Sequence, residues 1–406
     1  MAAANDFIHD KLDLETRQIR LLKVDPKTPV GGPMICKLEV FPVSKNTVYT
    51  ALSYTWGPPP STETILVNGA PFKVRQNLYD FLYMAWWMSM EQYFWIDQIC
   101  IDQQNTEEKN HQIKLMGLIY HQAQGVLAWL GRHSRDSDHA IRFVKSVALS
   151  GDVNDCIRIL ENTYDGAPVL KAQYQHATTS FFARPYWGRL WVVQEMNLAR
   201  SVSFYCGPTE FSLSELKRII RDSLKLWEAP TINPDAMRLI IDSQDLIAMT
   251  AIPNDTETWA SLKLLRAPLR NARTRLRSLV WLHCDAACVD PRDKIYGLLS
   301  LATDYGAALA EELLLDVDYN KTTAEVFWDF LTLVIVDHVK IETLEQSLSF
   351  TLWVCQWQKE WEKYGSRIMV AMGVQCTNFE NRIVGIAQDE FRRRKVKFEA
   401  ATTPPD

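Results

Sequence analysis

Acidic residues next to aromatic or apolar residues are the groups in this sequence that could carry out chemistry. Asp97 and Asp102 lie in the polar stretch DQICIDQQNTEEKN, and Glu195 ends the stretch WVVQE, in which Trp191 is the first residue. Two carboxylates can act as acid and base when their surroundings separate their pKa values. A carboxylate beside large rings is partly desolvated, which raises its pKa and makes it a candidate reactive group.

Each of these acids also has a purely structural interpretation. Aspartates after a strand commonly cap turns and the following helix, which suits Asp97 and Asp102. Glu195 could pair with Arg189 or Arg200 on a solvated helix face. Residue type and spacing favour the structural interpretation for all three, and they leave the catalytic one open.

Other motifs that indicate a specific chemistry are missing from the sequence. It contains no GxGxxG, GxxxxGK, GxSxG or HExxH. The eight cysteines are scattered through a long chain, which is typical of reduced thiols rather than a disulfide framework. His283, Cys284 and Cys288 lack a second ligand pair at zinc spacing. We therefore expect neither a metal nor a resident cofactor.

Composition limits the class of protein. The 406 residues are 47% hydrophobic and 23% charged, which is typical of a globular chain with a large core. The formal net charge of −5 argues against a nucleic-acid partner, which would require a basic face. The N-terminal residues show no secretory signal, and no apolar run approaches the ~20 residues of a membrane span. These features predict a cytoplasmic protein without a membrane span.

Strand and helix patterns alternate over the first half of the chain. Residues 1–44 are interpreted as a leader because prolines and glycines interrupt them. A strand is expected over 48–56, a hairpin about Asn68-Gly69, and a helix starting near Asn77. Further strands are expected at 93–96, 126–130 and 201–206, and further helices at 107–123 and within 181–200.

Short apolar strands that alternate with helices predict an α/β domain with a mostly parallel sheet, over residues 45–207 with the hairpin inserted near its N-terminus. Ligands of such sheets bind beyond the carboxyl ends of the strands. The loop after Trp56, the loop that starts at Asp97 and the region from Trp187 to Glu195 should therefore meet at one edge of the sheet.

The second half of the chain has a different character. Helical patterns dominate residues 208–400, beginning with a capping box formed by Ser212 and Glu215. Asp290-Pro291 is expected to open a helix, and long amphipathic runs follow at 322–339 and 342–364. We predict a mainly helical C-terminal region and a frayed tail at 401–406.

Three ordered blocks in the sequence resemble the fungal heterokaryon incompatibility (HET) domain. They are ALSYTWG, FWIDQICIDQQNTEEKNHQIKLMGLIYHQAQGVLAWLG and FFARPYWGRLWVVQEMNLA, and DPRDKIYGLLSLA resembles a fourth block found downstream in that family. The resemblance covers about residues 45–205. It implies a fold similar to the Toll/interleukin-1 receptor (TIR) domain, which is flavodoxin-like, and a role in non-self recognition and programmed cell death.

The resemblance also implies a site. Some TIR domains hydrolyse NAD with a single glutamate on a helix that also carries tryptophan, and Glu195 matches that position. NAD is therefore the candidate substrate, with Glu195 and Asp97 as candidate catalytic residues. The candidate substrate-binding residues are Trp56, Tyr54, Gly57, Asp102, Trp187, Arg189 and Trp191.

Three functions follow from these observations. The first is an incompatibility effector that cleaves NAD or a related nucleotide. The second is a non-catalytic signalling module that works by self-association. The third is a stand-alone enzyme of fungal secondary metabolism that acts on a small apolar substrate, since an aromatic pocket with one or two carboxylates would also suit cation-guided chemistry.

Overall fold

The fold is that of a computed structural model of the chain. The structure describes residues 7–134, 137, 141, 176–217, 275–302, 315–338, 366–375, 382, 384–386 and 388–389. The chain forms two compact units, Met1–Ala272 and Arg273–Asp406, and each is described by itself. The sequence predicts a boundary at residue 207, but two strands pair as a hairpin across this point, so the first unit extends beyond it.

The first unit is built on a nine-stranded sheet with the order β5-β4-β2-β1-β6-β3-β7-β8-β9. The strands are β1 (Gln18–Val24), β2 (Ile35–Pro42), β3 (Thr50–Tyr54), β4 (Glu63–Val67), β5 (Ala70–Val74), β6 (Phe94–Trp95), β7 (Gly125–Trp129), β8 (Val202–Cys206) and β9 (Thr209–Ser212). The helices that frame this sheet in the described residues include α1 (Gln76–Trp87), α2 (Asp97–Cys100), α3 (Thr106–Gln122), the 3-10 helix η1 (Pro185–Gly188) and α7 (Leu190–Asn197).

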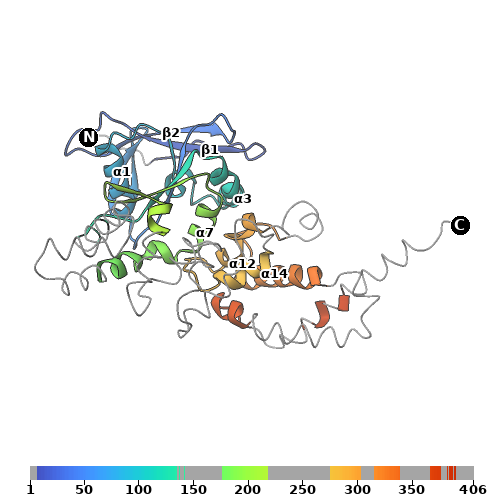
Figure 1. Ribbon diagram of the computed structural model, residues 1–406. Helices are drawn as coiled ribbons and strands as arrows, with labels where there is room; N and C mark the ends of the chain where they lie inside the picture. The colour runs from blue at the N-terminus through green and yellow to red at the C-terminus, as the bar shows by residue number, and fades with distance from the viewer. Residues whose placement is uncertain are drawn as a thin grey trace, which may run out of the picture. The chain divides into compact units, whose positions relative to one another are not determined.

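Four parallel strands form the centre of the sheet. β3 pairs in parallel with β6 on one side and β7 on the other, and β7 pairs in parallel with β8. In chain order this arrangement is 2-1-3-4, the order of flavodoxin-like sheets. The crossovers through α1 and α3 run in opposite directions, so right-handed connections place these helices on opposite faces of the sheet (Figure 1). The predicted α/β class is confirmed.

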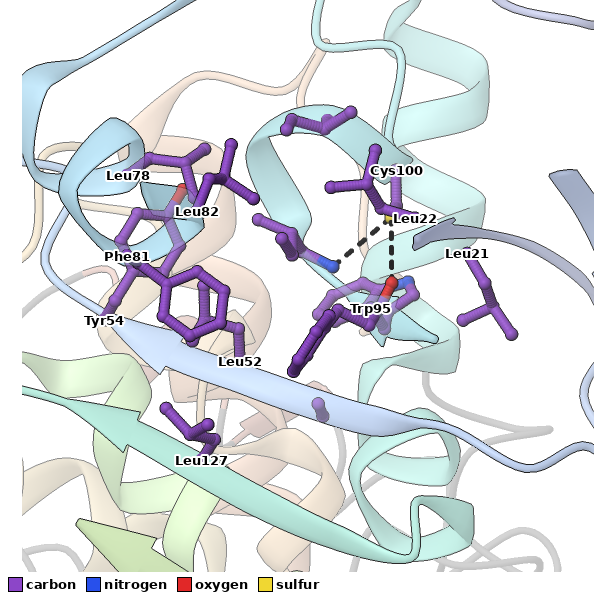
Figure 2. Packing of buried hydrophobic residues seen from close by; sticks show 14 of the residues in the cluster. Leu21, Leu22, Leu52, Tyr54, Leu78, Phe81, Leu82, Trp95, Cys100 and Leu127 are labelled. Carbon is purple, nitrogen blue, oxygen red and sulfur yellow. Dashed lines mark hydrogen bonds between the residues drawn. The ribbon is translucent and has the colours of Figure 1, made fainter. Parts of the chain in front are cut away.

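The central strands are buried on both faces, as their continuous apolar sequences predict. Leu52 and Tyr54 of β3 and Leu127 of β7 belong to one core cluster with Phe81 of α1. Figure 2 shows Cys100 at the edge of this cluster, where its sulfur accepts a hydrogen bond from the N–H of Ile96 at 3.3 Å. Burial raises the pKa of the Cys100 thiol to about 12, so the thiol stays protonated at neutral pH.

The hairpin predicted about Asn68-Gly69 joins β4 and β5, which pair antiparallel. Asn68 has φ 50° and Gly69 has φ 83°, so both central residues of the turn adopt the left-handed conformation. A two-residue type I′ turn requires this conformation, and Asn-Gly adopts it at low cost. The dipeptide therefore determines the turn locally.

The segment interpreted as a leader contributes two strands instead. β1 lies inside the sheet, where it pairs antiparallel with β2 over seven residues and with β6 at Leu22 and Phe94. The prolines and glycines between residues 26 and 33 lie in the connection between β1 and β2. These residues therefore form a loop between two strands. The apolar run in QIRLLKV is a strand because its side chains are buried beside β6.

The second unit is helical in its described part, as predicted. It contains α12 (Leu276–His283), α13 (Asp293–Tyr296), the 3-10 helix η3 (Leu299–Leu301) and α14 (Thr323–His338). α13 begins at Asp293, after the Asp290-Pro291 pair, and Arg292 binds the Asp290 carboxylate with Nε at 2.9 Å and Nη2 at 2.6 Å. The helix expected over 342–364 and the tail at 401–406 lie outside the described residues.

None of the helices in the described ranges combines the length and the apolar character that crossing a bilayer requires. Those ranges also hold no group of three or more His, Cys, Asp or Glu side chains placed to bind a metal ion.

Candidate functional site

The three predicted segments meet at the carboxyl edge of the central strands. β3 carries Ser53 and Tyr54 at its end, and Asp97, the first residue of α2, is separated from β6 by one residue. Glu195 reaches Ser53 from α7, a helix that contacts α3. Strands β3, β6 and β7 run in parallel, so their carboxyl ends share one edge, where open α/β sheets bind ligands.

Glu195 is the most deeply placed acid of the site, with only 2% of its surface exposed. The Ser53 hydroxyl donates a short hydrogen bond to its Oε2 atom. The Tyr186 hydroxyl lies 2.8 Å from Ser53 Oγ, so serine links the tyrosine to the carboxylate. Arg189 Nη1 lies 3.8 Å from the same Glu195 oxygen, which is an ion pair beyond hydrogen-bond distance.

The surroundings of Glu195 raise its pKa from the ordinary value of 4.5 to about 7. Burial is the main cause, because the charged form loses its water. Arg189 and the Ser53 hydroxyl act in the opposite direction, and the nearby charge of Asp97 raises the pKa further. A carboxyl group that titrates near neutral pH can exchange protons with a substrate under physiological conditions.

Asp97 is the second acid of the site and is only half-buried. The Trp56 indole N–H donates to its Oδ2 atom at 2.8 Å, and the N–H of Gln98 donates to Oδ1 at 2.7 Å. Desolvation raises the pKa of Asp97, whereas Arg189 and the two hydrogen bonds lower it. The net effect is that the pKa of Asp97, like that of Glu195, is raised, with desolvation as the largest cause in both.

Arg189 connects the two acids. Its guanidinium donates a short hydrogen bond to the carbonyl of Tyr54, at the end of β3. From there its positive charge acts on both Glu195 and Asp97. Its own pKa is raised, because the attraction of these carboxylates outweighs the desolvation that would lower it. Arg189 therefore stays charged, and its charge lowers the pKa of both acids.

Trp56 and Gly57 form the outer side of the site. The Trp56 ring is half-buried, and the Arg75 guanidinium lies 5.3 Å from its centre. Gly57 has φ +80°, a conformation that favours glycine, and a Cβ there would lie 3.6 Å from the Cβ of Asn77. The chain thus turns sharply after β3 and leaves the Trp56 indole directed at Asp97.

Three of the predicted binding residues lie deeper than the sequence suggests. Trp187 is fully buried, and its indole N–H donates to the Phe181 carbonyl at 3.1 Å. Tyr54 is also buried, and its hydroxyl donates to Gln98 Oε1 at 3.2 Å. Trp191 is half-buried and packs against the main core. These three side chains therefore pack beneath the site rather than at its entrance.

Asp102 lies apart from the other acids, in the turn before α3. Its Oδ1 atom accepts from the N–H of Gln104 at 3.1 Å, and its own N–H donates to Glu108 Oε1 at 2.8 Å. This is the geometry of a residue that shapes a turn.

Ser53 and Tyr186 belong to the site, although the sequence interpretation does not select them. Ser53 is fully buried in the otherwise apolar end of β3, and Tyr186 lies in η1, just before α7. A hydroxyl in a buried strand needs a hydrogen-bond partner, which is the one signal that could have identified Ser53.

The arrangement suits a reaction in which positive charge builds up on the substrate. A carboxylate in a site with little water stabilises such a charge strongly. Asp97, which is more exposed and hydrogen-bonded to Trp56, is placed to bind or deprotonate a polar group at the entrance.

Comparison with known proteins places these residues in a recognised domain. Residues 49–195 match the family model described as "Heterokaryon incompatibility protein (HET)". "Heterokaryon incompatibility protein 6, OR allele" from Neurospora crassa is 30% identical over 397 residues, which cover 84% of this chain and 55% of that protein. The chain therefore spans about half the length of this curated relative. No solved structure is a significant match. The segment that carries Ser53, Asp97 and Glu195 coincides with the family match, and the chain is a member of the heterokaryon incompatibility family through this domain.

Proposed function

We propose that the chain acts in heterokaryon incompatibility, as a non-self recognition protein, and that its HET domain hydrolyses NAD or a related nucleotide at Glu195. The observation that carries the proposal is a buried carboxylate with a pKa of about 7 at the carboxyl edge of parallel strands. The relative's name supports the biological role, and the residues around Glu195 support the chemistry.

In this reaction the bond between the nicotinamide nitrogen and ribose C1′ breaks, and its electron pair leaves with nicotinamide. Positive charge builds up on the ribose, where the Glu195 carboxylate stabilises it. Water then bonds to C1′ and gives its proton to Asp97, which releases it to solvent. The products are nicotinamide, ADP-ribose and a proton, so no other reactant is needed.

The substrate would enter past Asp97 and Trp56, the half-buried side of the site. Trp56 can contact a flat nicotinamide or adenine ring, and its bond to Asp97 sets the direction of the indole. Ser53, Tyr186 and Arg189 would hold the Glu195 carboxylate in one orientation during the reaction.

The test is to incubate the purified chain with NAD and measure nicotinamide by chromatography. Glu195→Gln should lower kcat by about 10²–10³-fold, because an amide cannot offset the developing positive charge. Glu107→Gln is the matched control, since Glu107 is exposed in the first turn of α3. If the wild type releases nicotinamide and Glu195→Gln releases it at the same rate, the proposed role of Glu195 is wrong.

A self-associating, non-catalytic module is the second candidate, and the surface of α1 favours it. Tyr83 and Trp87 on this helix are 51% and 63% exposed, although both are large aromatic residues. Exposed aromatic residues of this size are typical of interaction surfaces. If this candidate is right, Trp87→Ser should reduce the mass measured by analytical ultracentrifugation, whereas Glu195→Gln should leave it unchanged.

A further inference from the structure

The neighbouring ends of β3 and β7 meet around Asn77, outside the Glu195 cluster. A helix was expected to start near Asn77; α1 begins at Gln76, and the Asn77 side chain contacts the strand ends. Its amide donates to the Thr55 carbonyl at 2.5 Å and accepts from the Trp129 indole at 3.0 Å. It thereby joins the loop after β3 to the end of β7, the position where flavodoxin-like sheets bind ligands.

Glycines border Asn77 on both sides. Gly57 follows β3 with φ +80°, and Gly131 follows β7 with φ +99°. A Cβ at Gly57 would lie 3.6 Å from the Asn77 Cβ, and one at Gly131 would lie 3.5 Å from Asn77 Oδ1. Glycines at such turns allow the backbone to approach a ligand closely.

Two arginines flank the same point. Arg75 Nη1 donates to the Gly57 carbonyl at 2.6 Å. Arg184 donates to the carbonyls of Leu130 and Arg132, at 2.6 and 3.0 Å. A Cβ at Gly131 would lie 3.3 Å from Arg184 Nη1, which places this guanidinium against the glycine turn. Carbonyl contacts therefore hold the two cations at the ends of β3 and β7.

Neither arginine forms an ion pair with a carboxylate of the described residues, in contrast to the neighbouring Arg132, which lies 2.5 Å from Asp80. A guanidinium has five N–H donors, and carbonyl contacts use one from Arg75 and two from Arg184. Both side chains are half-buried and keep donors for another acceptor. Guanidinium groups with free donors are the preferred protein ligands of phosphate.

We propose that Arg75 and Arg184 form a subsite for the phosphate groups of a nucleotide, next to the Glu195 site. The inference rests on the proposed function and narrows its substrate class. It predicts a substrate with an anionic diphosphate group rather than a small apolar molecule. Arg75 also lies over Trp56, whose indole binds Asp97, so the subsite and the acids share one aromatic side chain.

The test is calorimetric titration of the full chain with ADP, pyrophosphate and adenosine, at low and high salt. ADP should bind, and Arg75→Gln and Arg184→Gln should each weaken it by about tenfold or more, since a hydrogen bond to a charged group contributes that much. Adenosine should bind weakly and equally to all variants. If pyrophosphate depends on the two arginines as ADP does, the diphosphate alone is recognised.

Arg200→Gln is the matched control. Arg200 is exposed and lies just before β8, on the opposite edge of the sheet. Its side chain donates to the carbonyl of His121, near the end of α3. It should leave ADP affinity unchanged. Arg75→Lys and Arg184→Lys keep the charge without the planar fork and should show intermediate losses, which provides a test even if a glutamine variant fails to fold.

The proposed hydrolysis and the subsite can fail separately. Glu195→Gln should slow nicotinamide release by about 10²–10³-fold and leave ADP binding intact. Arg184→Gln should raise KM more than it lowers kcat. Arginine-dependent ADP binding without nicotinamide release would support the subsite and contradict the hydrolysis. ADP affinity that is unchanged in both arginine variants, or that adenosine matches, would overturn the subsite.

Discussion

Two arginine–glutamate pairs with a buried glutamate lie in the first unit, and they differ in geometry. Arg20 of β1 binds Glu108 of α3 with two hydrogen bonds, at 2.6 and 2.9 Å, and both side chains are almost fully buried. Glu195 is also buried, whereas 16% of the Arg189 side chain is exposed, and their nearest nitrogen and oxygen atoms are 3.8 Å apart. The N–H of Arg189 is directed to the Tyr54 carbonyl instead.

This difference in geometry reverses the direction in which the pKa of the glutamate shifts. Burial by itself would raise the pKa of Glu108, but the hydrogen bonds from Arg20 and the Asp102 N–H outweigh it, and the pKa is lowered. Burial of Glu195 is not offset in this way, and its pKa rises to about 7. The same residue types therefore make a permanent ion pair in one place and a titratable acid in the other.

The two pairs also differ in what they hold together. Arg20 donates to the carbonyls of Asp10 and Cys100 as well as to Glu108, so it ties the N-terminal segment to α2 and α3. Glu195 accepts a hydrogen bond from Ser53, at the edge of the sheet where the proposed substrate would react. The first pair stabilises the fold, and the second is suited to chemistry.

The largest expected effect comes from breaking the first pair. Arg20→Met leaves the Glu108 carboxylate buried without its partner, which should lower the free energy of unfolding by about 3–5 kcal/mol. Urea denaturation followed by circular dichroism measures this. The double variant Arg20→Met, Glu108→Leu removes both charges and should recover much of the loss. A loss below about 1 kcal/mol in the single variant would show that the pair does not stabilise the fold.

The second effect is a pH dependence with opposite signs for the two glutamates. The folded pKa of Glu195 is above its ordinary 4.5, so its contribution to stability is lost as pH rises from about 4.5 to about 7. Relative to Glu195→Gln, the wild type should lose about 3 kcal/mol between pH 5 and pH 8. Parallel stability curves for the two proteins over this range would contradict the raised pKa.

Glu108→Gln provides the opposite comparison. The folded pKa of Glu108 is lowered, so its contribution is present above the unfolded pKa and is lost as pH falls through the folded value. The difference between wild type and this variant should therefore shrink only in acid, below the range in which Glu195 titrates.

A smaller effect should follow from Ser53→Ala. The Ser53 hydroxyl lowers the pKa of Glu195, so its removal should raise that pKa and move the pH profile of nicotinamide release to higher pH. Stability should fall by about 1 kcal/mol, because Tyr186 also loses a hydrogen-bond partner. Ser201→Ala, an exposed serine before β8, is the control. An unchanged pH profile would remove Ser53 from the site.

The smallest effect is expected at the surface. Lys37 and Glu39 form a 2.8 Å pair on β2, with 66% and 32% of their side chains exposed. Water screens such pairs, so Lys37→Ala should change the free energy of unfolding by less than about 1 kcal/mol. A loss as large as that of Arg20→Met in the same urea experiment would mean that burial is not what distinguishes the pairs.

Local sequence signals were sufficient for much of the fold. Asn68-Gly69 predicts its turn because only a few residue types adopt positive φ without strain, and α3 follows its helical spacing over Thr106–Gln122. Ser212 and Glu215 form the predicted capping box, with the Glu215 N–H 3.2 Å from Ser212 Oγ. Each of these signals involves residues close together in the chain.

The place of β1 could not be predicted in the same way. Its partners are Ile35–Pro42 and β6, and the prolines and glycines that follow β1 suggested a leader. A central place in a sheet depends on hydrogen bonds with distant strands, which periodicity within one segment does not reveal.

The sequence by itself predicted the α/β alternation, the family and the edge at which Trp56, Asp97 and Glu195 meet, because apolar periodicity and turn chemistry are local and sheets of this class bind ligands at one edge. Only the tertiary structure decided that Ser53 and Tyr186 reach Glu195, and that Arg20 binds its glutamate closely while Arg189 does not. The pKa of a carboxyl group depends on burial and on hydrogen bonds from residues far away in the chain, which packing alone brings together.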